Sequence, residues 1–391
     1  MNVAIFHPRM GFGGSEAPAM WALEALKRDY RVALVAGGRI DLDALNSFCG
    51  TSIDRSACEL VEIPLPWPLT NSDWGAALRG ALVSRGMRQY FDRFDVLISA
   101  YNIADFGRPG IHFLADFSWD EDLRQSLDPA PRGARGLVHL NRPLRRGYLA
   151  FANAVAGRTP RAPHATGLVL ANSEWSRELL MRRHAIESRV LYPPVGAPGS
   201  SALKMRRFVC IGRLSAEKRI ERIIEIVKAV RGRRHDVELH IVGDTRETPY
   251  AQGIEQLCKR EAGWIVMHGR LVGTAKYRLL AESSFGIHAR AEEPFGIAVA
   301  EMAAAGCIPF VPAAGGPAEI VNNPKLNYDS VADAVAKIDA ILTNPALEHE
   351  TRVALTRRAQ DFSIASFQDG IRNIVAEFTE SQELNRSAAA R

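Results

Sequence analysis

Short apolar runs alternate with longer amphipathic segments along the first half of the chain. The runs are five or six residues long and rich in β-branched side chains, which is typical of buried strands, and the segments between them have helical spacing. This alternation predicts a parallel sheet covered by helices on both faces. The expected strands are 2–6, 31–35, 94–99, 110–115 and 167–171, and helices are expected at 14–27, 73–92 and 173–184.

The alternation breaks and then restarts in the second half. Residues 190–207 are rich in Pro, Gly and Ser, and Pro193 and Pro194 favour an extended crossing, so we expect a linker there. The helix after the first strand beyond this linker has an apolar stripe of the spacing that a core requires. The second set of strands is expected at 207–212, 237–243, 264–269, 284–289 and 307–312, and the stripe consists of Ile220, Ile223, Ile224, Val227 and Val230.

The two series of alternating strands and helices predict an α/β protein with two doubly wound, Rossmann-like domains. A chain of 391 residues is longer than one hydrophobic core usually organises. We expect a first domain at 1–195 and a second at 196–365, with a C-terminal helix at about 365–385 that packs back on the first domain. Ligands collect beyond the carboxyl ends of the strands in such sheets, so we expect the functional site in a cleft between the domains.

The composition is that of an ordinary globular protein, with 47% hydrophobic and 24% charged residues. The first residues lack a basic leader followed by a long apolar stretch, and no run of about 18 apolar residues occurs, which disfavours export and membrane spanning. The five cysteines are scattered without a CxxC pair, which disfavours a disulfide framework and a structural zinc site. We therefore expect a cytoplasmic protein.

Positive charge is concentrated in the span 129–173, where seven arginines occur and no acidic residue does. Such a span suits anionic lipid head groups at the inner membrane face or a phosphorylated acceptor. A solvated face whose arginine stems cover apolar surface explains it equally well. No nucleic-acid-binding motif accompanies the charge, so we expect no binding of nucleic acid. From the arginine-rich span we expect peripheral membrane contact.

The first predicted strand is followed by a glycine-rich turn, "FHPRMGFGGSE" at 6–16. Glycines let backbone N–H groups approach an anion at a helix N-terminus, and Ser15 could cap the helix that follows. The spacing differs from GxGxxG, so a nicotinamide dinucleotide is disfavoured. Taken alone, the pattern is equally typical of a plain turn.

Two cations lie around the corresponding turn of the second domain. "CIGRLSAEKR" at 210–219 places Arg213 and Lys218 between a strand and a helix. Arg offers a planar fork and Lys a point charge, so together they would neutralise a diphosphate. The alternative is a solvated turn in which Lys218 pairs with a neighbouring acid.

Two glutamates bracket a helix start in "EEPFGIAVAE" at 292–301, where Pro294 is expected to mark the first turn. A rise of about 1.5 Å per residue places Glu293 and Glu301 up to roughly 12 Å apart, with free N–H groups nearer to Glu293. Carboxylates accept hydrogen bonds from adjacent hydroxyls, and the helix dipole favours a diphosphate between them. The alternative is that Glu293 only favours the helix N-terminus and Glu301 is exposed.

Several motifs together resemble one enzyme family. "GRLSAEK", "EEPFGIAVAEMAAAG" and "GGPAEIV" follow "YPPV" in this order, with "GFGG" and "LANSEWSRELL" earlier in the chain. They resemble the family 4 retaining glycosyltransferases of the GT-B fold, the group 1 glycosyl transferases. The resemblance covers nearly the whole chain and is strongest between about 190 and 322.

The resemblance implies roles for individual residues. Arg213 and Lys218 would bind the diphosphate and stabilise it as the leaving group, while Glu301 would hold the ribose and Glu293 the transferred sugar. Gly13 and Gly14 would approach the phosphates from the first domain. The other expected donor-binding residues are Met267 and His268 at the nucleobase, His288 near the sugar or phosphate, and Phe295, Gly296 and Ile297 at the helix start.

The family often has a His or Asp near the reacting centre at a strand end of the first domain. Here "GIHFLADFSW" at 110–119 offers both His112 and Asp116, and Asp116 is the slightly favoured candidate. Either residue could instead make ordinary structural bonds, and the same holds for His288. Asp41 with Asp43, and Asp120 with Asp122, have DxD spacing, but neither pair has the sequence context of a metal site.

The resulting hypothesis is a retaining glycosyltransferase that needs neither metal nor cofactor. It would move a hexose from a nucleoside diphosphate sugar, of the GDP-mannose or UDP-glucose type, to a glycan or lipid-linked acceptor in polysaccharide biosynthesis. Two alternatives remain: a GT-B-like sugar-nucleotide epimerase or hydrolase, and a non-catalytic nucleotide-sugar sensor. The donor sugar and base, acceptor, linkage and oligomeric state are left open by the sequence.

Overall fold

The computed structural model describes residues 1–66, 75–123, 141–157, 167–197, 202–243, 248–261 and 263–389. Within these residues the chain forms two compact units, each built on a parallel sheet. The first unit contains Met1–Asn172, Arg177–Leu191 and Phe367–Arg391, and the second contains Ser173–Ser176 and Tyr192–Ser366. The chain therefore re-enters the first unit twice and the second unit once.

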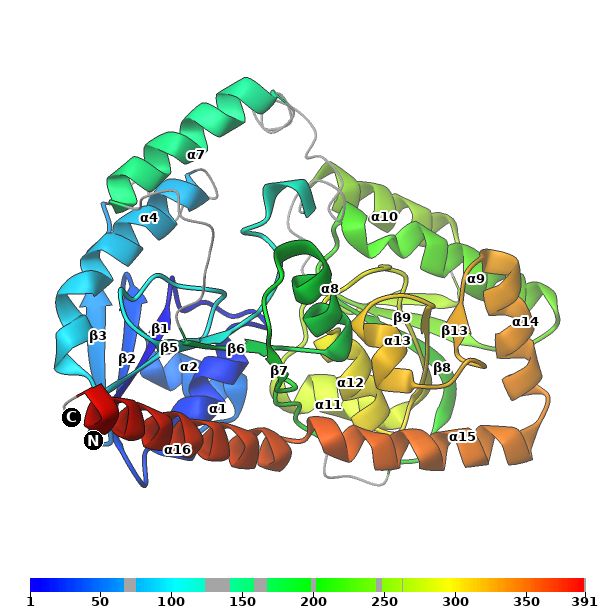
Figure 1. Ribbon diagram of the computed structural model, residues 1–391. Helices are drawn as coiled ribbons and strands as arrows, with labels where there is room; N and C mark the ends of the chain where they lie inside the picture. The colour runs from blue at the N-terminus through cyan, green and yellow to red at the C-terminus, as the bar shows by residue number, and fades with distance from the viewer. Residues whose placement is uncertain are drawn as a thin grey trace. The chain divides into compact units, whose positions relative to one another are not determined.

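The first unit has a seven-stranded sheet in the order β3-β2-β1-β4-β5-β6-β7, with every adjacent pair parallel (Figure 1). This order reverses direction next to β1, as in doubly wound folds. The strands are β1 (Asn2–His7), β2 (Arg31–Gly37), β3 (Cys58–Ile63), β4 (Val96–Ser99), β5 (Gly110–Phe113), β6 (Gly167–Ala171) and β7 (Arg189–Val190).

Helices cover both faces of this sheet because successive side chains of each strand point to opposite faces. Val3 and Ile5 of β1 pack with α1, α2 and α16, whereas Ala4 and Phe6 pack with α4 and η1. The helices are α1 (Glu16–Leu26), α2 (Leu42–Cys49), α4 (Ala76–Met87), the 3-10 helix η1 (Arg88–Arg93), α7 (Arg142–Ala156), α8 (Glu174–His184) and α16 (Ile364–Ala389).

The second unit has a six-stranded parallel sheet in the order β10-β9-β8-β11-β12-β13 (Figure 1). Its strands are β8 (Met205–Ile211), β9 (Glu238–Val242), β10 (Ile265–Met267), β11 (Ser283–Ile287), β12 (Ile308–Pro312) and β13 (Asn327–Tyr328). Its helices are η2 (Ala216–Lys218), α9 (Ile220–Gly232), α10 (Pro249–Arg260), α11 (Gly273–Glu282), α12 (Ile297–Ala304), α13 (Gly316–Val321), α14 (Val331–Leu342), α15 (Pro345–Arg358) and η3 (Ala359–Phe362).

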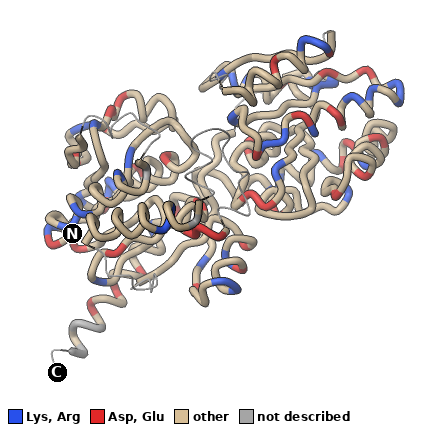
Figure 2. Tube along the Cα trace, turned by 90° about the horizontal axis from the view of Figure 1, so that it is seen from above, with Lys and Arg blue, Asp and Glu red and all other residues tan. Residues whose placement is uncertain are grey.

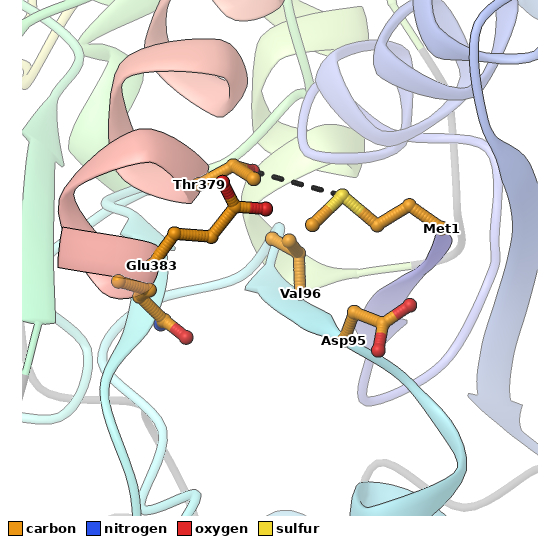
Figure 3. Close-up of a pocket in the computed structure, with 6 residues that line it drawn as sticks. Met1, Asp95, Val96, Thr379 and Glu383 are labelled. Carbon is orange, nitrogen blue, oxygen red and sulfur yellow. Dashed lines mark hydrogen bonds between the residues drawn. The ribbon is translucent and has the colours of Figure 1, made fainter. Parts of the chain in front are cut away.

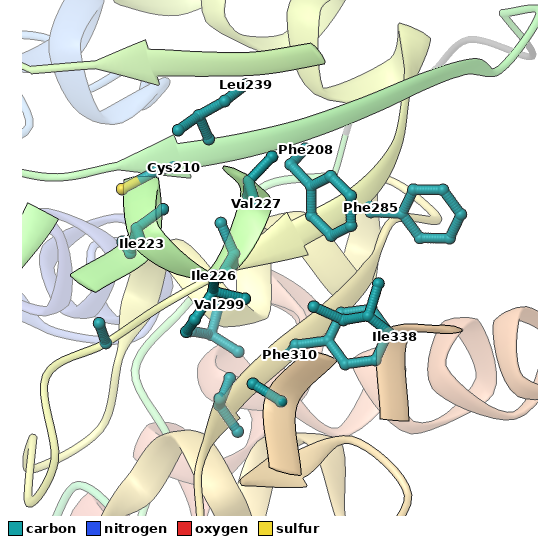
Figure 4. Packing of buried hydrophobic residues seen from close by; sticks show 14 of the residues in the cluster. Phe208, Cys210, Ile223, Ile226, Val227, Leu239, Phe285, Val299, Phe310 and Ile338 are labelled. Atoms are coloured by element: carbon teal, nitrogen blue, oxygen red, sulfur yellow. The ribbon is translucent and has the colours of Figure 1, made fainter. Parts of the chain in front are cut away.

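The core of the second unit lies between the sheet and α9 and α14. Phe208, Phe285 and Phe310 come from three neighbouring strands and are fully buried (Figure 4). The apolar stripe expected on the helix after the first restarted strand is confirmed, because all five of its side chains on α9 are buried in this core. On the opposite face, Leu279 and Leu280 of α11 pack with Met302 of α12.

The strands expected from the apolar runs are all present, so the α/β prediction with two parallel sheets is confirmed. Three strands were not expected: β3, β7 and β13. Each lies at a sheet edge, where β3 alternates buried and exposed positions because Glu59 and Glu62 interrupt its apolar residues. The two others are only two residues long and lack any apolar run.

Charged residues of both signs are interspersed along the helices, as Figure 2 shows for the second unit. In the part of the chain that the structure describes, no helix is both long and apolar enough to span a bilayer. Of the arginine-rich span 129–173, residues 129–140 and 158–166 lie outside the described residues. Helix α7 is the main described element of that span.

Candidate functional site

A partly buried cluster of charges lies at the carboxyl ends of β8 and β11. The Glu293 carboxylate accepts a hydrogen bond from Lys218 Nζ at 2.6 Å, and its second oxygen lies 2.6 Å from His288 Nε2. Lys218 ends the short helix η2, whereas His288 directly follows β11. The sequence-based candidates Lys218, His288 and Glu293 are therefore brought together by two strands that are hydrogen-bonded neighbours.

The surroundings of Glu293 favour its ionised form. Burial alone would raise the pKa of the carboxyl group, but the charges of Lys218 and His288 outweigh burial and hold the pKa well below the ordinary 4.5. A carboxylate whose pKa is held this low stays charged at neutral pH, so it can accept hydrogen bonds from a ligand.

The loop that carries Glu293 has a shape fixed by close packing. Gly315 and Gly316 lie against its backbone, and a Cβ on Gly316 would sit 2.5 Å from Phe295 Cα and Pro294 O. The Gly316 amide also donates to the Glu293 carbonyl at 2.8 Å. Within the loop, Glu292 adopts a left-handed φ of 54°, which is unusual for a residue other than glycine. The glycines of the motif "GGPAEIV" therefore determine the backbone shape of the loop that carries Glu293.

The helix after this loop begins later than the sequence indicates. Gly296 is the N-cap of α12 with a left-handed φ of 98°, so the first helical residue is Ile297 and not Pro294. The expected start at Pro294 is therefore wrong. The Pro294 carbonyl is instead taken by the hydroxyl groups of Ser173 at 2.6 Å and Ser176 at 3.2 Å. A glycine is needed at 296 because other residues rarely adopt this backbone conformation.

Phe295 contributes to the core and not to an open surface. Its ring is 3% exposed and lies against the rings of Tyr192 and Phe362. Tyr192 donates from its hydroxyl to Glu319 at 2.6 Å, and Glu319 also accepts the amides of Glu174 and Trp175. Phe295 thus anchors the loop in the core, while Glu293 of the same loop takes part in the charged cluster.

Glu301 is buried, so the alternative in which Glu301 is merely an exposed charge is wrong. It lies on α12, is 8% exposed and accepts from Lys276 Nζ of α11 at 2.6 Å. Burial lowers the pKa of Lys276, but the Glu301 carboxylate outweighs burial and raises it above its ordinary value. Lys276 was not among the residues expected from the sequence, because a single lysine on a helix carries no distinguishing signal.

Arg213 lies apart from this buried cluster. It follows the end of β8, and its side chain is 75% exposed, with only a 3.7 Å approach to Glu217. Glu217 also accepts from the Ser215 hydroxyl at 2.5 Å. Arg213 is thus an exposed cation near the same strand end, with room to move toward a ligand.

Met267 ends the edge strand β10, and His268 follows it. The His268 ring stacks on His240, with 2.9 Å between His268 Nε2 and His240 Nδ1, and Glu238 contacts the far nitrogen of His240 at 3.1 Å. Burial lowers the pKa of both imidazoles, and the neighbouring His240 further disfavours charge on His268. The amide of His268 is used by the sheet, since it donates to Ile241 O at 2.9 Å.

The glycine-rich turn of the first unit holds an anion from its own chain. Glu16 accepts the amide of Gly11 at 3.0 Å, the amide of Gly13 at 3.1 Å and the Ser15 hydroxyl at 3.1 Å. Ser15 makes no capping bond, so its expected role as a side-chain cap is wrong. The carboxylate satisfies amides that the serine cannot reach, and this role of Glu16 was not expected.

His112 and Asp116 occupy different environments at the end of β5. His112 is 1% exposed, lies against Phe106 and accepts the Ala104 amide through Nδ1 at 3.3 Å. Asp116 is partly exposed and accepts from Asn102 Nδ2 at 2.9 Å and the Tyr101 hydroxyl at 3.3 Å. Of the two, Asp116 has the surface through which a ligand could reach it.

The first aspartate of each pair with DxD spacing makes structural bonds. Asp41 caps α2 by accepting the Ala44 amide, and Asp120 accepts the Leu123 amide and contacts His184 at 2.9 Å. Among the described residues, no group of three His, Cys, Asp or Glu side chains is arranged to hold a metal ion.

Two hollows in the first unit lie away from the carboxyl ends of its strands. One has a volume of about 270 Å³ and lies by Met1, Asp95 and Val96, where β1 and β4 begin (Figure 3). The other, of about 560 Å³, lies by Arg108 and Gly167, where β5 and β6 begin. Both are lined by residues of α16, and neither contains a site residue expected from the sequence.

Comparison with known families and curated proteins finds similarity to glycosyltransferases. Residues 199–362 match the family described as glycosyl transferases group 1. A GDP-Man:Man(3)GlcNAc(2)-PP-Dol alpha-1,2-mannosyltransferase of Dictyostelium discoideum is 25% identical over 232 residues, 52% of this chain and 45% of the relative. A protein of the same name from Eremothecium gossypii is 31% identical over 170 residues, 38% of this chain and 29% of the relative. The matched regions thus span less than half of these curated relatives.

Solved structures show the fold over nearly the whole chain. WaaG, a glycosyltransferase involved in lipopolysaccharide biosynthesis, superposes with a TM-score of 0.67 and 17% identity, covering 95% of this chain and 99% of WaaG. Sucrose-phosphate synthase from Thermosynechococcus elongatus gives 0.68 at 14% identity, covering 97% and 99%. Anabaena HepE in complex with UDP and glucose gives 0.67 at 17% identity, covering 96% and 100%. These superpositions confirm the GT-B fold, and the family match over residues 199–362 confirms the resemblance to group 1 glycosyltransferases.

Proposed function

Because residues 199–362 match the glycosyl transferases group 1 family, we propose that the chain is a retaining glycosyltransferase. It transfers a hexose from a nucleoside diphosphate sugar to a hydroxyl group of a glycan or lipid-linked acceptor in polysaccharide biosynthesis. The observation that carries the proposal is the partly buried cluster of Lys218, Glu293 and His288, in which Glu293 lies four residues before the start of α12. This cluster combines the Lys218 ammonium group for a leaving diphosphate with the Glu293 carboxylate for sugar hydroxyls.

The proposed chemistry depends on stabilising the departing diphosphate. Negative charge develops on the diphosphate as the bond to the sugar breaks, and Lys218, Arg213 and the N–H groups at the start of α12 would stabilise it. Arg213 is exposed and would close onto the phosphates when the donor binds. The acceptor hydroxyl would attack the sugar on the face from which the diphosphate departs, and an oxygen of the diphosphate would take the hydroxyl proton. The sugar then keeps its anomeric configuration, and no protein nucleophile is required.

The remaining donor interactions follow from the same assignment. Glu301 would bind the ribose hydroxyls, main-chain groups at Met267 and His268 would hold the base, and Gly13 and Gly14 would approach the phosphates. Because Glu16 already occupies the Gly13 amide, phosphate contact there requires Glu16 to move. Asp116 is the proposed polar group beside the acceptor because, unlike His112, it is partly exposed.

Two donor types are supported by different relatives. The curated relatives are named for GDP-Man and a Man(3)GlcNAc(2)-PP-Dol substrate, which favours a mannosyl donor and a lipid-linked acceptor. HepE has been solved with UDP-glucose, which keeps a glucosyl donor open. We propose that the reaction takes place in the cytoplasm. All five cysteines are free thiols, as a reducing compartment requires.

A transfer assay with Lys218→Ala tests the proposed reaction. The chain is incubated with GDP-mannose or UDP-glucose and a lipid-linked glycan extract, and both sugar incorporation and free nucleoside diphosphate are measured. We expect sugar incorporation that falls by about 100-fold or more in Lys218→Ala, as for loss of one charge at a developing anion. Lys228→Ala is the matched control, because Lys228 is an exposed lysine paired with Glu261 on the outside of the unit.

The same assay separates the alternatives. Release of nucleoside diphosphate without incorporation would identify a hydrolase, conversion of the sugar nucleotide an epimerase, and binding without turnover a sensor. Wild-type turnover in Lys218→Ala would contradict the proposed role of this residue. Because the proposed chemistry uses protein cations, a chelator should leave transfer unchanged.

We also propose that α7 contacts an anionic membrane surface. Leu144 and Phe151 are 59% and 58% exposed and lie seven residues apart, so they share one side of the helix. Arg146 of α7 is also exposed, and α7 contains no acidic residue. Ala152 and Ala156 of α7 pack on Ala81 of α4. Exposed apolar and basic side chains on one helix suit the lipid interface.

Vesicle sedimentation tests this membrane contact. The chain should bind vesicles that contain phosphatidylglycerol, less so at high salt, and the double variant Leu144→Ser, Phe151→Ser should lose most of the binding. Val353→Ser is the control, because Val353 is an exposed apolar residue on α15. Equal binding by the double variant and the wild type would contradict the membrane contact.

A further inference from the structure

Lys276 is a partly buried charge that none of the roles above uses. It lies on α11, and its ammonium group donates to Glu301 Oε1 on α12 at 2.6 Å. The two helices share one apolar cluster, in which Leu280 and Met302 are fully buried. This packing fixes the helix backbones, so the pair lies at a defined place in the second unit.

The pair at Glu301 repeats the pair at Glu293. Each glutamate accepts from one lysine at 2.6 Å, and each lysine comes from a different element: Lys218 from η2 and Lys276 from α11. The side chains of Lys276 and Glu301 retain 20% and 11% exposure, so the pair is shielded but not sealed from solvent. Both ends of the segment 293–301 thus present a carboxylate with a lysine partner.

Stability alone gives little reason for such a pair. Desolvation of two charges roughly cancels their attraction, so a buried ion pair contributes little net stability compared with apolar side chains of similar size. What the pair does supply is orientation, since the ammonium group holds one carboxylate oxygen in place. A carboxylate has about four lone-pair sites on two oxygens, so Glu301 keeps capacity for further donors.

We propose that Lys276 is a positioning residue that orients Glu301 toward the ribose diol of the donor, and thereby makes the site select ribose over deoxyribose. This inference rests on the proposed function and deepens it. With Lys276 in place, Glu301 accepts from the ribose hydroxyl groups without first losing rotamer freedom. Without Lys276, the carboxylate would turn toward water, and the contribution of the diol to binding would fall.

Nucleotide binding provides the test, because it needs no acceptor. The dissociation constants of GDP and UDP and of their 2′-deoxy counterparts are measured by calorimetry for the wild type, Lys276→Met and Glu301→Gln. In the wild type we expect the ribonucleotide to bind about tenfold more tightly than the deoxynucleotide, the value of one hydrogen bond to a charged group. In Lys276→Met the preference should fall to about twofold.

A second variant guards against loss of folding. Lys276→Gln keeps a hydrogen-bond donor and a good helix former but removes the charge, so it should fold and show an intermediate preference. Thermal unfolding is followed for every variant, and Lys337→Met, which breaks a partly exposed pair with Asp333, is the control. The control should keep the wild-type preference.

The outcomes distinguish this inference from the proposed function. An unchanged preference in folded Lys276→Met or Lys276→Gln, with only lower thermal stability, would make Lys276 a structural residue and overturn the inference. Tight binding of nucleotides by the wild type without preference for ribose would also overturn it, while leaving the transferase proposal standing. Failure of the wild type to bind any of these nucleotides would overturn both.

Discussion

Glu293 shows how the surroundings of a single residue determine its chemistry. The glutamate alone could have been an ordinary charge near a helix start. With Lys218 and His288 each at 2.6 Å, its carboxyl group has a pKa well below the ordinary value despite burial. Removing one member of such a cluster leaves the others buried without their partner, which costs more than the cluster contributes as a whole.

Glu293→Gln should therefore change how stability depends on pH. A carboxyl group with a depressed pKa in the folded state stabilises the protein above its unfolded value, near 4.5, and this contribution is lost as the pH falls toward the folded value. We expect the wild type to lose stability below about pH 4.5 more steeply than Glu293→Gln, which is less stable at neutral pH by about 3 kcal/mol. Urea unfolding followed from pH 7 to pH 3 measures both effects.

Glu350→Gln is the control for this prediction, because Glu350 is an exposed glutamate on α15. It should follow the wild-type curve at every pH. Parallel curves for the wild type and Glu293→Gln across the acid range would contradict the ionised state assigned to Glu293.

At the scale of elements, α13 and its leading glycines position the loop between β11 and α12. Gly315 has a left-handed φ of 87°, and Gly316 leaves no room for a Cβ against Pro294 and Phe295. The loop backbone in turn directs Glu293 toward Lys218. A small change in α13 should therefore reach the charged cluster through packing, with no charge altered.

Gly316→Ala tests this link. The new methyl group would lie 2.5 Å from backbone atoms of Phe295 and Pro294, so the loop must shift. We expect a loss of thermal stability and at least about tenfold weaker nucleotide binding, as for misplacement of binding groups. Gly253→Ala is the matched control: it lies on α10 with no atom within 4 Å of a Cβ, and should raise stability by about 0.5–1 kcal/mol.

Tight nucleotide binding by Gly316→Ala would show that the loop tolerates the shift. A loss of stability in Gly253→Ala would mean that the new methyl group meets a neighbour there. Differential scanning calorimetry and nucleotide titration on the same preparations distinguish these results.

At the scale of the whole molecule, the chain builds two units but does not finish one before starting the other. Helix α16 ends the sequence, yet from Phe367 onward it belongs to the first unit. Its apolar residues Phe367, Ile371 and Val375 are buried against strands and helices from the first part of the chain. The first unit therefore has a complete core only when the C-terminal helix is present.

Phe367→Ala should destabilise the first unit selectively. Truncation of a buried phenylalanine costs about 3–5 kcal/mol, and the Phe367 ring packs against Phe113 within the core of the first unit. Hydrogen exchange should become faster in peptides from β1 and β2, whereas peptides from β8 and β11 keep their protection. Phe151→Ala, at an exposed position, should leave both sets unchanged. Equal loss of protection in both units would mean that they unfold together.

Much of the fold follows from local patterns. Apolar runs bounded by polar segments specify strands, and 3.6-residue spacing specifies helices, because both signals lie within a few neighbouring residues. The edge strands β3, β7 and β13 escaped prediction because an edge strand needs little apolar surface. The start of α12 was misplaced because Pro294, which is typical of a first helical turn, lies in a loop that packs against Gly316, 22 residues away in the sequence.

The sequence by itself determined the α/β class, the two sheets and the motif with Glu293 and Glu301, since each depends on residue types at short, regular spacing. Only the tertiary structure decided the partners of those carboxylates: Lys218 and Glu293 are 75 residues apart, and Lys276 and Glu301 are 25 apart. It alone placed Glu16 on the glycine amides and buried His112 while leaving Asp116 partly exposed. The physical reason is that a side chain's partners, and with them its charge and orientation, depend on which distant elements pack together.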